Sequence, residues 1–219
     1  MKVCTDACLF GAWVTPVANK KSNVHFLDIG AGTGLLSLML AQRYTNAFIA
    51  AAEIDPAAAT QAKENFEESI WKDRLSLHHS SIQNFQTSNK YDCIISNPPF
   101  FEGDLKSSNP QKNLALHSTQ LNFKELTHKA IHLLLPNGYF AVLLPFARSA
   151  EFEQMMDSLQ LHQKILIKQT PKHNYFRSIL IFNAENSKQN SVIEISIKDD
   201  SNQYTNDFKQ LLTPYYLHL

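Results

Sequence analysis

A cluster of alternating glycines, flanked by two acidic residues, is the first part of this sequence that could do chemistry. Gly30, Gly32 and Gly34 follow a short apolar stretch that contains Asp28, and Glu53 ends the next apolar stretch. Glycine lets a chain turn sharply and lets a ligand lie against bare backbone. The spacing G-x-G-x-G differs from the dinucleotide pattern G-x-G-x-x-G, and no lysine follows it as in a phosphate-binding P-loop.

The two acids favour a nucleoside ligand that carries positive charge. Glu53 is placed where an acid can accept hydrogen bonds from both ribose hydroxyls of an adenosine. Asp28 in the same crevice would repel a pyrophosphate but attract an ammonium or sulfonium group. The pattern therefore predicts S-adenosylmethionine as the cofactor, bound by the glycine turn and both acids.

A second constellation, Asn97-Pro98-Pro99-Phe100, directly follows another apolar stretch. An amino group conjugated to a ring is a poor nucleophile because its lone pair is delocalised. The Asn97 side-chain oxygen and the Pro98 carbonyl can accept hydrogen bonds from such a group and direct its lone pair toward a methyl donor. The prolines keep the carbonyl fixed, and Phe100 can stack on the base. These four residues are the predicted catalytic set, and Asn97 is also expected to bind the cofactor.

The elements that position both constellations alternate between strand and helix. Apolar runs predict strands at Val24–Ile29, Phe48–Ile54, Leu75–His78, Tyr91–Ser96 and Tyr139–Leu144. Helices are predicted at Leu35–Tyr44, Ala57–Ser69, Phe123–Leu135 and Glu151–Leu159. Ile165–Lys168 and Ser178–Phe182 resemble an antiparallel pair, Val192–Ile197 an exposed-edge strand, and Asn206–Leu212 a closing helix.

This order predicts a doubly wound, mostly parallel seven-stranded α/β sheet with an antiparallel C-terminal strand pair. The length of 219 residues fits a single domain, 1–219. Within it, residues 1–23 would form an N-terminal segment and residues 184–219 a C-terminal strand and helix addition. In parallel sheets, the carboxyl ends of the strands share one edge, so the glycine turn and Asn97 are expected to lie close together.

Composition limits the classes of protein that remain. No apolar run is long enough to span a bilayer, and the N-terminus does not resemble a signal peptide, so a cytoplasmic protein is expected. Three cysteines and scattered histidines indicate neither a disulfide framework nor a metal site. The formal net charge is +0, but nine basic residues stand against four acidic ones between positions 105 and 180, which allows a basic RNA-binding half.

The two constellations also resemble known motifs. Residues 28–34, Asp-Ile-Gly-Ala-Gly-Thr-Gly, look like motif I of class I methyltransferases, and Glu53-Ile54-Asp55 looks like the acidic motif after their second strand. In such enzymes an Asp often follows the third strand and binds the adenine. This chain has serines there, so Ser81 and the Ile82 backbone are the expected substitutes. Asn97 to Phe100 resemble motif IV of methyltransferases that act on adenine, on guanine N2 or on protein glutamine.

The N-terminus favours one of these families. Residues 1–13 are similar to the opening of the bacterial valine-tRNA adenine-N6 methyltransferases, with Thr5-Asp6 and Gly11-Ala12-Trp13 kept, although Cys4 and Ala7 replace the usual glycines. The ending from Tyr204 to Leu217 is similar too. The resemblance implies that the N-terminal segment, including Thr5, packs over the methionine end of the cofactor. It also implies methylation of the adenine immediately 3′ of the anticodon.

Substrate contacts are expected on two stretches. The polar stretch that follows Asn97 would border the target base, and the stretch from 172 to 177 mixes basic and aromatic residues, as an RNA-contacting hairpin would. The predicted RNA-binding residues are Phe100, Phe101, Lys106, Lys112, His117, Lys172 and Arg177.

Three other interpretations remain open. An rRNA guanine-N2 enzyme shares Asn-Pro-Pro-Phe but usually carries another large domain. A protein-glutamine methyltransferase typically has a helical domain ahead of motif I, whereas only 27 residues precede Asp28 here. A non-catalytic cofactor-binding subunit would not need both motifs intact. The oligomeric state and the residues that touch RNA are left undetermined.

Overall fold

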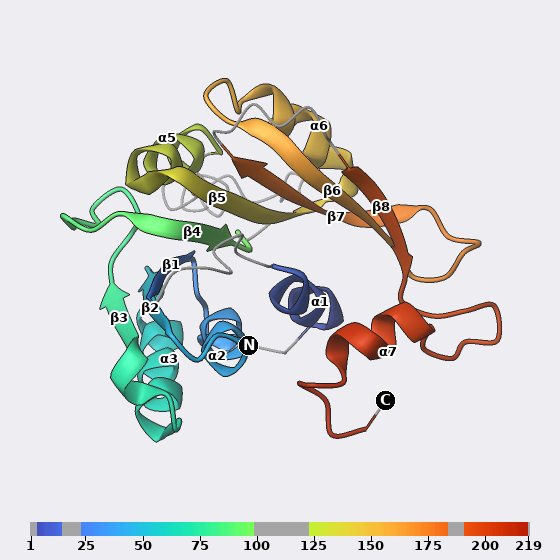
Figure 1. Cartoon of the computed structure of the whole chain (residues 1–219), viewed down its shortest axis with the longest axis horizontal. Helices are drawn as coiled ribbons and strands as arrows, with labels where there is room; N and C mark the ends of the chain where they lie inside the picture. Colours follow the sequence, from blue (N-terminus) through green and yellow to red (C-terminus); the bar gives the residue numbers. More distant parts are fainter. Residues whose placement is uncertain (1–3, 15–22, 99–122, 184–190, 219) are drawn as a thin grey trace, which may run out of the picture.

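The computed structural model describes residues 4–14, 23–98, 123–183 and 191–218, which fold around one eight-stranded sheet (Figure 1). The strand order is β3-β2-β1-β4-β5-β7-β6-β8. The strands are β1 Val24–Ile29, β2 Ala47–Glu53, β3 Leu75–His79, β4 Tyr91–Ser96, β5 Leu134–Pro145, β6 Gln160–Lys168, β7 Tyr175–Asn183 and β8 Ser191–Ser196. The first five strands in this order, β3, β2, β1, β4 and β5, are parallel to one another. Strand β7 runs antiparallel to both β5 and β6.

Helices cover both faces of the sheet. They are α1 Thr5–Trp13, α2 Leu35–Arg43, α3 Pro56–Glu68, α5 Phe123–Leu133, α6 Phe146–Gln154 and α7 Asn206–Leu212. Helices α1, α2 and α7 share one apolar core with the sheet, and α5 and α6 share a second core on the other face. Figure 1 shows this division, with α5 and α6 above the central strands and α1, α2 and α3 below them.

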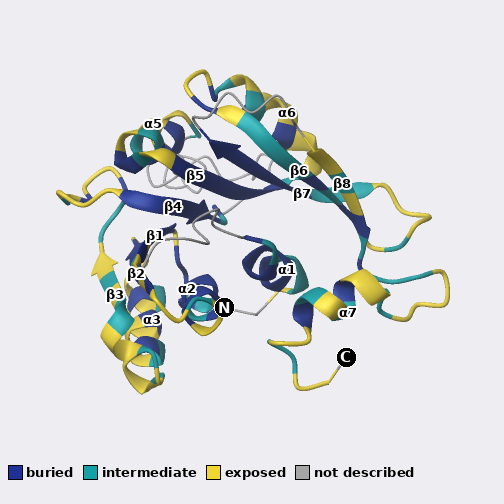
Figure 2. Ribbon diagram, viewed as in Figure 1, coloured by how far each residue is buried: buried dark blue, intermediate teal, exposed yellow. Residues whose placement is uncertain are grey.

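Local sequence explains why these elements form where they do. All six residues of β4 are buried, as expected for a strand covered on both faces (Figure 2). Helix α3 begins with Pro56 at its first turn, and the Asp55 side chain accepts a hydrogen bond from the Ala58 N–H over 2.7 Å. A proline there loses no hydrogen bond, and an aspartate cap satisfies one of the free backbone donors.

Helix α1 is buried on nearly every side. Its residues from Ala7 to Ala12 are all buried, which is the pattern of a helix enclosed by other elements rather than lying on the surface. It packs against α2 and α7. A Cβ atom added at Gly11 would lie 2.7 Å from Met39 Sδ, so the glycine permits the close approach of α1 to α2.

The predicted fold class is confirmed, with differences at its C-terminal end. The sheet has eight strands rather than seven, because β8 pairs in parallel with β6 and extends the edge. The expected antiparallel pair is β6 and β7. The helix expected at Glu151–Leu159 instead begins at Phe146, directly after Pro145. Ser149 and Phe152 are buried one turn apart, and this packing fixes the earlier start.

No helix in the described ranges is long and apolar enough to cross a membrane.

Candidate active site

The two predicted constellations meet at the carboxyl edge of the parallel strands. Ile29 pairs with both Ala52 of β2 and Ser96 of β4, so the glycine turn, Glu53 and Asn97 follow three neighbouring strand ends. The Ser96 hydroxyl donates a hydrogen bond to the Ile29 carbonyl over 2.8 Å and ties β4 to β1 at this edge. The sequence prediction that these residues lie together is therefore matched by the register of the sheet.

The glycine turn adopts a backbone conformation that other residues rarely take. Gly30, Gly32 and Gly34 have φ angles of 73°, 58° and 85°, in the left-handed region that costs glycine little. A Cβ atom at Gly34 would lie 2.4 Å from the Phe66 ring, so this glycine also serves packing. Among the described residues, a Cβ atom at Gly30 would meet no atom within 4 Å, so the backbone there is bare on that side and can accept a ligand.

Glu53 is held in place by backbone donors. Its Oε2 accepts a hydrogen bond from the Gly32 N–H over 2.7 Å, and its Oε1 accepts one from the Asp55 N–H over 2.8 Å. The residue is 7% exposed. Each carboxylate oxygen has two acceptor positions, so both can still accept a hydroxyl donor. The arrangement fits a ribose whose two hydroxyls donate to one preoriented carboxylate.

Asp28 is fully buried behind the glycine turn. Its Oδ2 accepts a hydrogen bond from the Ser37 hydroxyl over 2.7 Å, whereas its Oδ1 is buried without a hydrogen-bond partner among the described residues. Burial raises the pKa of Asp28 to about 7; hydrogen bonding to Ser37 opposes the rise, and the charge of Glu53 adds to it. A buried acceptor without a partner costs free energy, and a cationic or hydrogen-donating ligand would relieve that cost.

These features fit S-adenosylmethionine. A ligand of that class would place its ribose at Glu53 and its positively charged groups on the side where Asp28 lies. Between them it would lie along the bare backbone of the glycine turn. The acidic pair would disfavour a pyrophosphate in the same place.

The predicted catalytic motif lies only in part within the described residues. Asn97 is half-buried and Pro98 is buried, directly after the last residue of β4. Pro99, Phe100, Phe101, Lys106, Lys112 and His117 lie outside the described residues.

The residues expected near the adenine also reach this edge. Strand β3 pairs with β2 as far as Glu53 and His79, and the Ser80 N–H donates to the Glu53 carbonyl over 2.9 Å. The Ser81 hydroxyl accepts a hydrogen bond from the Asn84 N–H over 3.3 Å, and Ile82 is buried. Ile54 is 51% exposed at the end of β2 and offers an apolar surface.

The first turn of α1 lies beside the carboxyl end of β5, because Asp6 pairs with Arg177 and Arg177 is the register partner of Pro145. Thr5 begins α1, and Tyr216, from the segment after α7, packs against the apolar core that contains Cys8. Burial raises the pKa of Tyr216 to about 12, and its hydrogen bond with Cys8 adds to the rise. The C-terminal end of the chain thus packs against α1.

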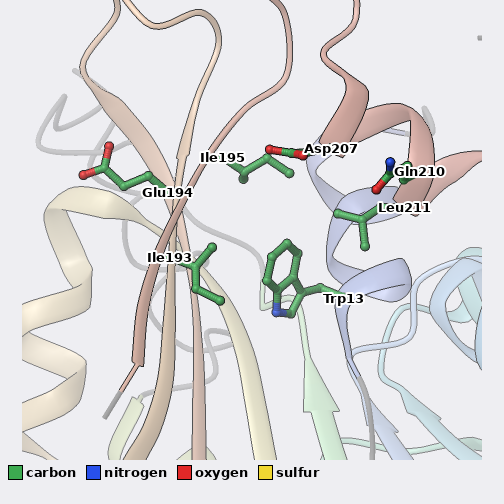
Figure 3. A pocket seen from close by; sticks show the side chains of 7 residues that line it. All are labelled: Trp13, Ile193, Glu194, Ile195, Asp207, Gln210 and Leu211. Carbon is green, nitrogen blue, oxygen red and sulfur yellow. The ribbon is translucent and has the colours of Figure 1, made fainter.

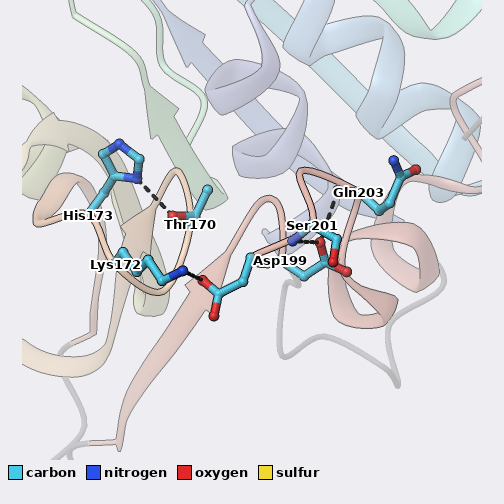
Figure 4. A network of polar contacts seen from close by, with 7 residues as sticks. Thr170, Lys172, His173, Asp199, Ser201 and Gln203 are labelled. Carbon is cyan, nitrogen blue, oxygen red and sulfur yellow. Dashed lines mark hydrogen bonds and ion pairs between the residues drawn. The ribbon is translucent and has the colours of Figure 1, made fainter.

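The two predicted RNA contacts in the β6–β7 hairpin, Lys172 in its turn and Arg177 in β7, have different surroundings. Lys172 is exposed in the turn, where it pairs with Asp200 over 3.5 Å beside the Thr170–His173 contact (Figure 4). Arg177 is instead partly buried, with its Nε 2.8 Å from Asp6 Oδ2. Lys172 can therefore contact a polyanion if its surface ion pair with Asp200 breaks. Arg177 already has a partly buried partner, Asp6.

Sequence reasoning missed two residues of this region. Ser37 interrupts the apolar run of α2 and is fully buried against Asp28, and a serine on the apolar face of a helix was the signal. Asp6 was noted only as part of a resemblance. Its pairing with Arg177, 171 positions away, left no local signal.

A shallow groove of about 310 Å³ lies elsewhere, between α1, β8 and α7, and Trp13, Ile193, Glu194, Ile195, Asp207, Gln210 and Leu211 line it. Figure 3 shows the Trp13 indole between β8 and α7. Two acidic side chains in this lining disfavour a phosphate backbone. In the part of the chain that the structure describes, no three His, Cys, Asp or Glu side chains gather as a metal site.

Comparison with known proteins identifies the family. Residues 14–165 match the family model described as "Methyltransferase small domain". A tRNA1(Val) (adenine(37)-N6)-methyltransferase of Dyadobacter fermentans is 40% identical over 99% of this chain and 91% of its own length. The protein of the same name from Flavobacterium johnsoniae is 40% identical over 100% of this chain and 94% of its own.

Solved structures agree on the fold. A crystal structure described as a predicted O-methyltransferase from Agrobacterium tumefaciens superposes with a TM-score of 0.73 at 16% identity, covering 97% of this chain and 98% of that one. The sequence-based family assignment is confirmed by the full-length relatives. Given their identity and coverage, the chain belongs to the tRNA1(Val) (adenine(37)-N6)-methyltransferase family, within the small-domain methyltransferases.

Proposed function

We propose that the protein transfers a methyl group from S-adenosylmethionine to N6 of adenine 37 in a valine tRNA. The observation that carries the proposal is the meeting of Glu53, the glycine turn and Asn97 at one sheet edge, in a chain whose full-length relatives bear that name. The whole chain would act as one cytoplasmic methyltransferase domain that needs no metal ion.

In this proposal, Asp28, Glu53, Gly30, Gly32, Gly34 and Ile54 hold the cofactor, with Thr5, Ser81 and Ile82 at its borders. When bound, the cofactor supplies an electrophilic methyl group. The rate would come mainly from orientation and from groups placed where charge develops.

Asn97 and Pro98 would act on the target amino group. The Asn97 side-chain oxygen and the Pro98 carbonyl accept hydrogen bonds from the two N–H groups of N6, which localises the nitrogen lone pair. No side chain has to remove a proton beforehand, and the proton lost after transfer can pass to water. Pro99 would keep this turn rigid and Phe100 would stack on the base. An anticodon-loop base is unpaired, which lowers the free energy needed to bring it into a site.

The experiment uses an unmodified valine tRNA transcript and a matched transcript with guanine at position 37. Each is incubated with the protein and methyl-labelled S-adenosylmethionine, and the digested nucleosides are identified by mass spectrometry. We expect N6-methyladenosine from the first transcript and no label in the second. Separate incubations with rRNA and with protein test the two alternative acceptors. N2-methylguanosine, or label in rRNA or protein but not in tRNA, would contradict the proposal.

A further inference from the structure

A partly buried ion pair between Asp6 and Arg177 connects helix α1 to the sheet. The Arg177 Nε donates to Asp6 Oδ2 over 2.8 Å, and the two side chains are 24% and 17% exposed, Arg177 and Asp6 respectively. A charge-assisted hydrogen bond of this length, partly shielded from water, is stronger than an exposed ion pair. It joins the first turn of α1 to the first residues of β7.

The register of the sheet places this pair at the cofactor edge. Arg177 pairs with Pro145 at the carboxyl end of β5, and β5 pairs with β4 through Val142 and Ser96. Neighbouring strands lie about 4.8 Å apart, so Arg177 stands only two strands, roughly 10 Å across the sheet, from the strand that leads into Asn97.

Helix α1 points its first turn toward the same edge. At its other end, the Trp13 Nε1 donates to Gln163 Oε1 over 2.9 Å, near the beginning of β6. Since β6 runs in the same direction as β5, the helix starts at the carboxyl edge and ends toward the amino edge. Asp6 is also bonded locally, because its Oδ1 accepts the Ala7 N–H over 3.0 Å.

We propose that Arg177 is a positioning residue for cofactor binding: through Asp6 it holds the first turn of α1 against the cofactor edge, and it does not contact RNA. The assignment rests on the proposed function for the identity of the cofactor. A phosphate that reached Arg177 would have to displace a carboxylate already 2.8 Å from it. Helix α1 also packs against α2 and α7, so the loss of Arg177 should loosen its first turn without unfolding the helix.

The test compares Asp6→Asn, Arg177→Gln and the double variant. Asparagine keeps an oxygen for the Ala7 N–H and removes only the charge. We expect the dissociation constant for S-adenosylmethionine, measured by calorimetry, to rise about tenfold in each single variant, as for one hydrogen bond to a charged group. The double variant should lose no more than either single one, because both remove the same interaction. Affinity for valine tRNA should stay within about twofold of the wild type.

Arg148→Gln is the matched control. Its Nε lies 2.7 Å from Glu151 Oε2, but both side chains are 48% exposed and the pair lies within α6. It should leave cofactor affinity unchanged. If Arg177→Gln weakens tRNA binding and spares cofactor affinity, Arg177 is an RNA contact and the proposal is wrong. The same holds if the losses of the two single variants add in the double variant.

Amide hydrogen exchange without cofactor or RNA tests the pair independently of methyl transfer. In Arg177→Gln, the amides of Cys8 to Phe10 should exchange at least about tenfold faster, while those of β1 and β4 keep their protection. Unchanged exchange in α1 would overturn the positioning role. If exchange in α1 is faster in Arg177→Gln but the wild-type protein methylates no tRNA, the ion pair still positions α1. Only the proposed function would then be wrong.

Discussion

The Gly32 N–H donates a hydrogen bond to Glu53 Oε2 over 2.7 Å, so the glycine turn that would receive the cofactor also orients the acid that would bind its ribose. The second oxygen of Glu53 is fixed in the same way by the Asp55 N–H, at the start of α3. Three consecutive features of the α/β fold, the first turn, the end of β2 and the cap of α3, are thereby joined into one rigid unit. Such preorganisation lowers the entropy lost when a ligand binds.

Replacing Glu53 with glutamine should therefore weaken cofactor binding. The amide nitrogen of glutamine would face the N–H of either Gly32 or Asp55, so one of these hydrogen bonds would be lost. The negative charge that favours the ribose hydroxyls would also be lost. We expect the dissociation constant for S-adenosylmethionine to rise about tenfold or more, since hydrogen bonds to charged groups contribute roughly 1.5–3 kcal/mol. Calorimetric titration measures it. Glu68→Gln, at an exposed position in α3, serves as the control, and equal affinities in the two variants would exclude Glu53 from the cofactor site.

Asn97→Ala should separate catalysis from cofactor binding. Asn97 follows β4 and is half-buried at the edge, and its proposed role lies in the transfer step. We expect kcat to fall roughly 100- to 1000-fold, the size typical of losing one group that orients or stabilises the reacting atoms, while cofactor affinity changes less than about threefold. Single-turnover methylation of tRNA gives the rate. Asn89→Ala, exposed before β4, should be unaffected, and a fully active Asn97 variant would disprove the assigned chemistry.

The buried carboxyl of Asp28 predicts a pH dependence of stability. Burial raises the pKa of Asp28 from 3.8 to about 7, so between these values the folded state binds more protons than the unfolded state. Stability contributed by this group is therefore lost as the pH rises through that window. Asp28→Asn removes the effect and keeps an acceptor for Ser37.

The quantity of interest is the melting temperature of Asp28→Asn minus that of the wild type, both without cofactor. We expect this difference to rise between about pH 5 and pH 7 and to level off above about pH 8. Differential scanning calorimetry across this range measures the difference. A difference that does not change with pH would show that Asp28 is ionised throughout in the folded protein. The same variant should bind S-adenosylmethionine more weakly, because it lacks the negative charge.

Alanine at Gly34 and at Gly30 should have contrasting effects. Both positions have positive φ angles, but only at Gly34 would the new methyl group meet a ring, with Phe66 at 2.4 Å. Backbone strain plus overpacking should cost Gly34→Ala about 3 kcal/mol of unfolding free energy. Gly30→Ala should cost about 1 kcal/mol yet place its methyl group in the space proposed for the cofactor. Denaturant unfolding and cofactor titration of both variants test this, and unimpaired cofactor binding by Gly30→Ala would place the ligand elsewhere.

Lys172→Glu tests the RNA surface without touching the proposed cofactor site. Its ion pair with Asp200 is exposed and contributes little to stability. We expect tRNA affinity to fall several-fold at low salt, and the slope of log affinity against log salt to decrease by about one. Filter binding at several salt concentrations measures both. An unchanged slope would remove this turn from the RNA interface.

The strand ends and the turns after them could be predicted from the sequence alone. The glycine turn after β1, Glu53 at the end of β2 and Asn97 after β4 could be assigned because strand and turn preferences are local, and because parallel strands bring their carboxyl ends to one edge. The predicted bounds of β1, β4 and α7 agree with the observed ones for the same reason. The full-length resemblance, confirmed by the relatives, rested on residues spread from the N-terminus to the C-terminus.

Which side chains meet across the fold was settled by tertiary packing. Arg177 is predicted to contact RNA because its neighbours in sequence are basic and aromatic, and the structure adds a partner for it in Asp6, 171 positions away. Ser37 is paired with Asp28 across the interface between α2 and β1, and β8 lies beside β6 rather than beside its neighbour in sequence, β7. Periodicity records which face of an element is buried, whereas the choice of a partner for a charge or a hydroxyl depends on how distant elements pack, and no local pattern encodes it.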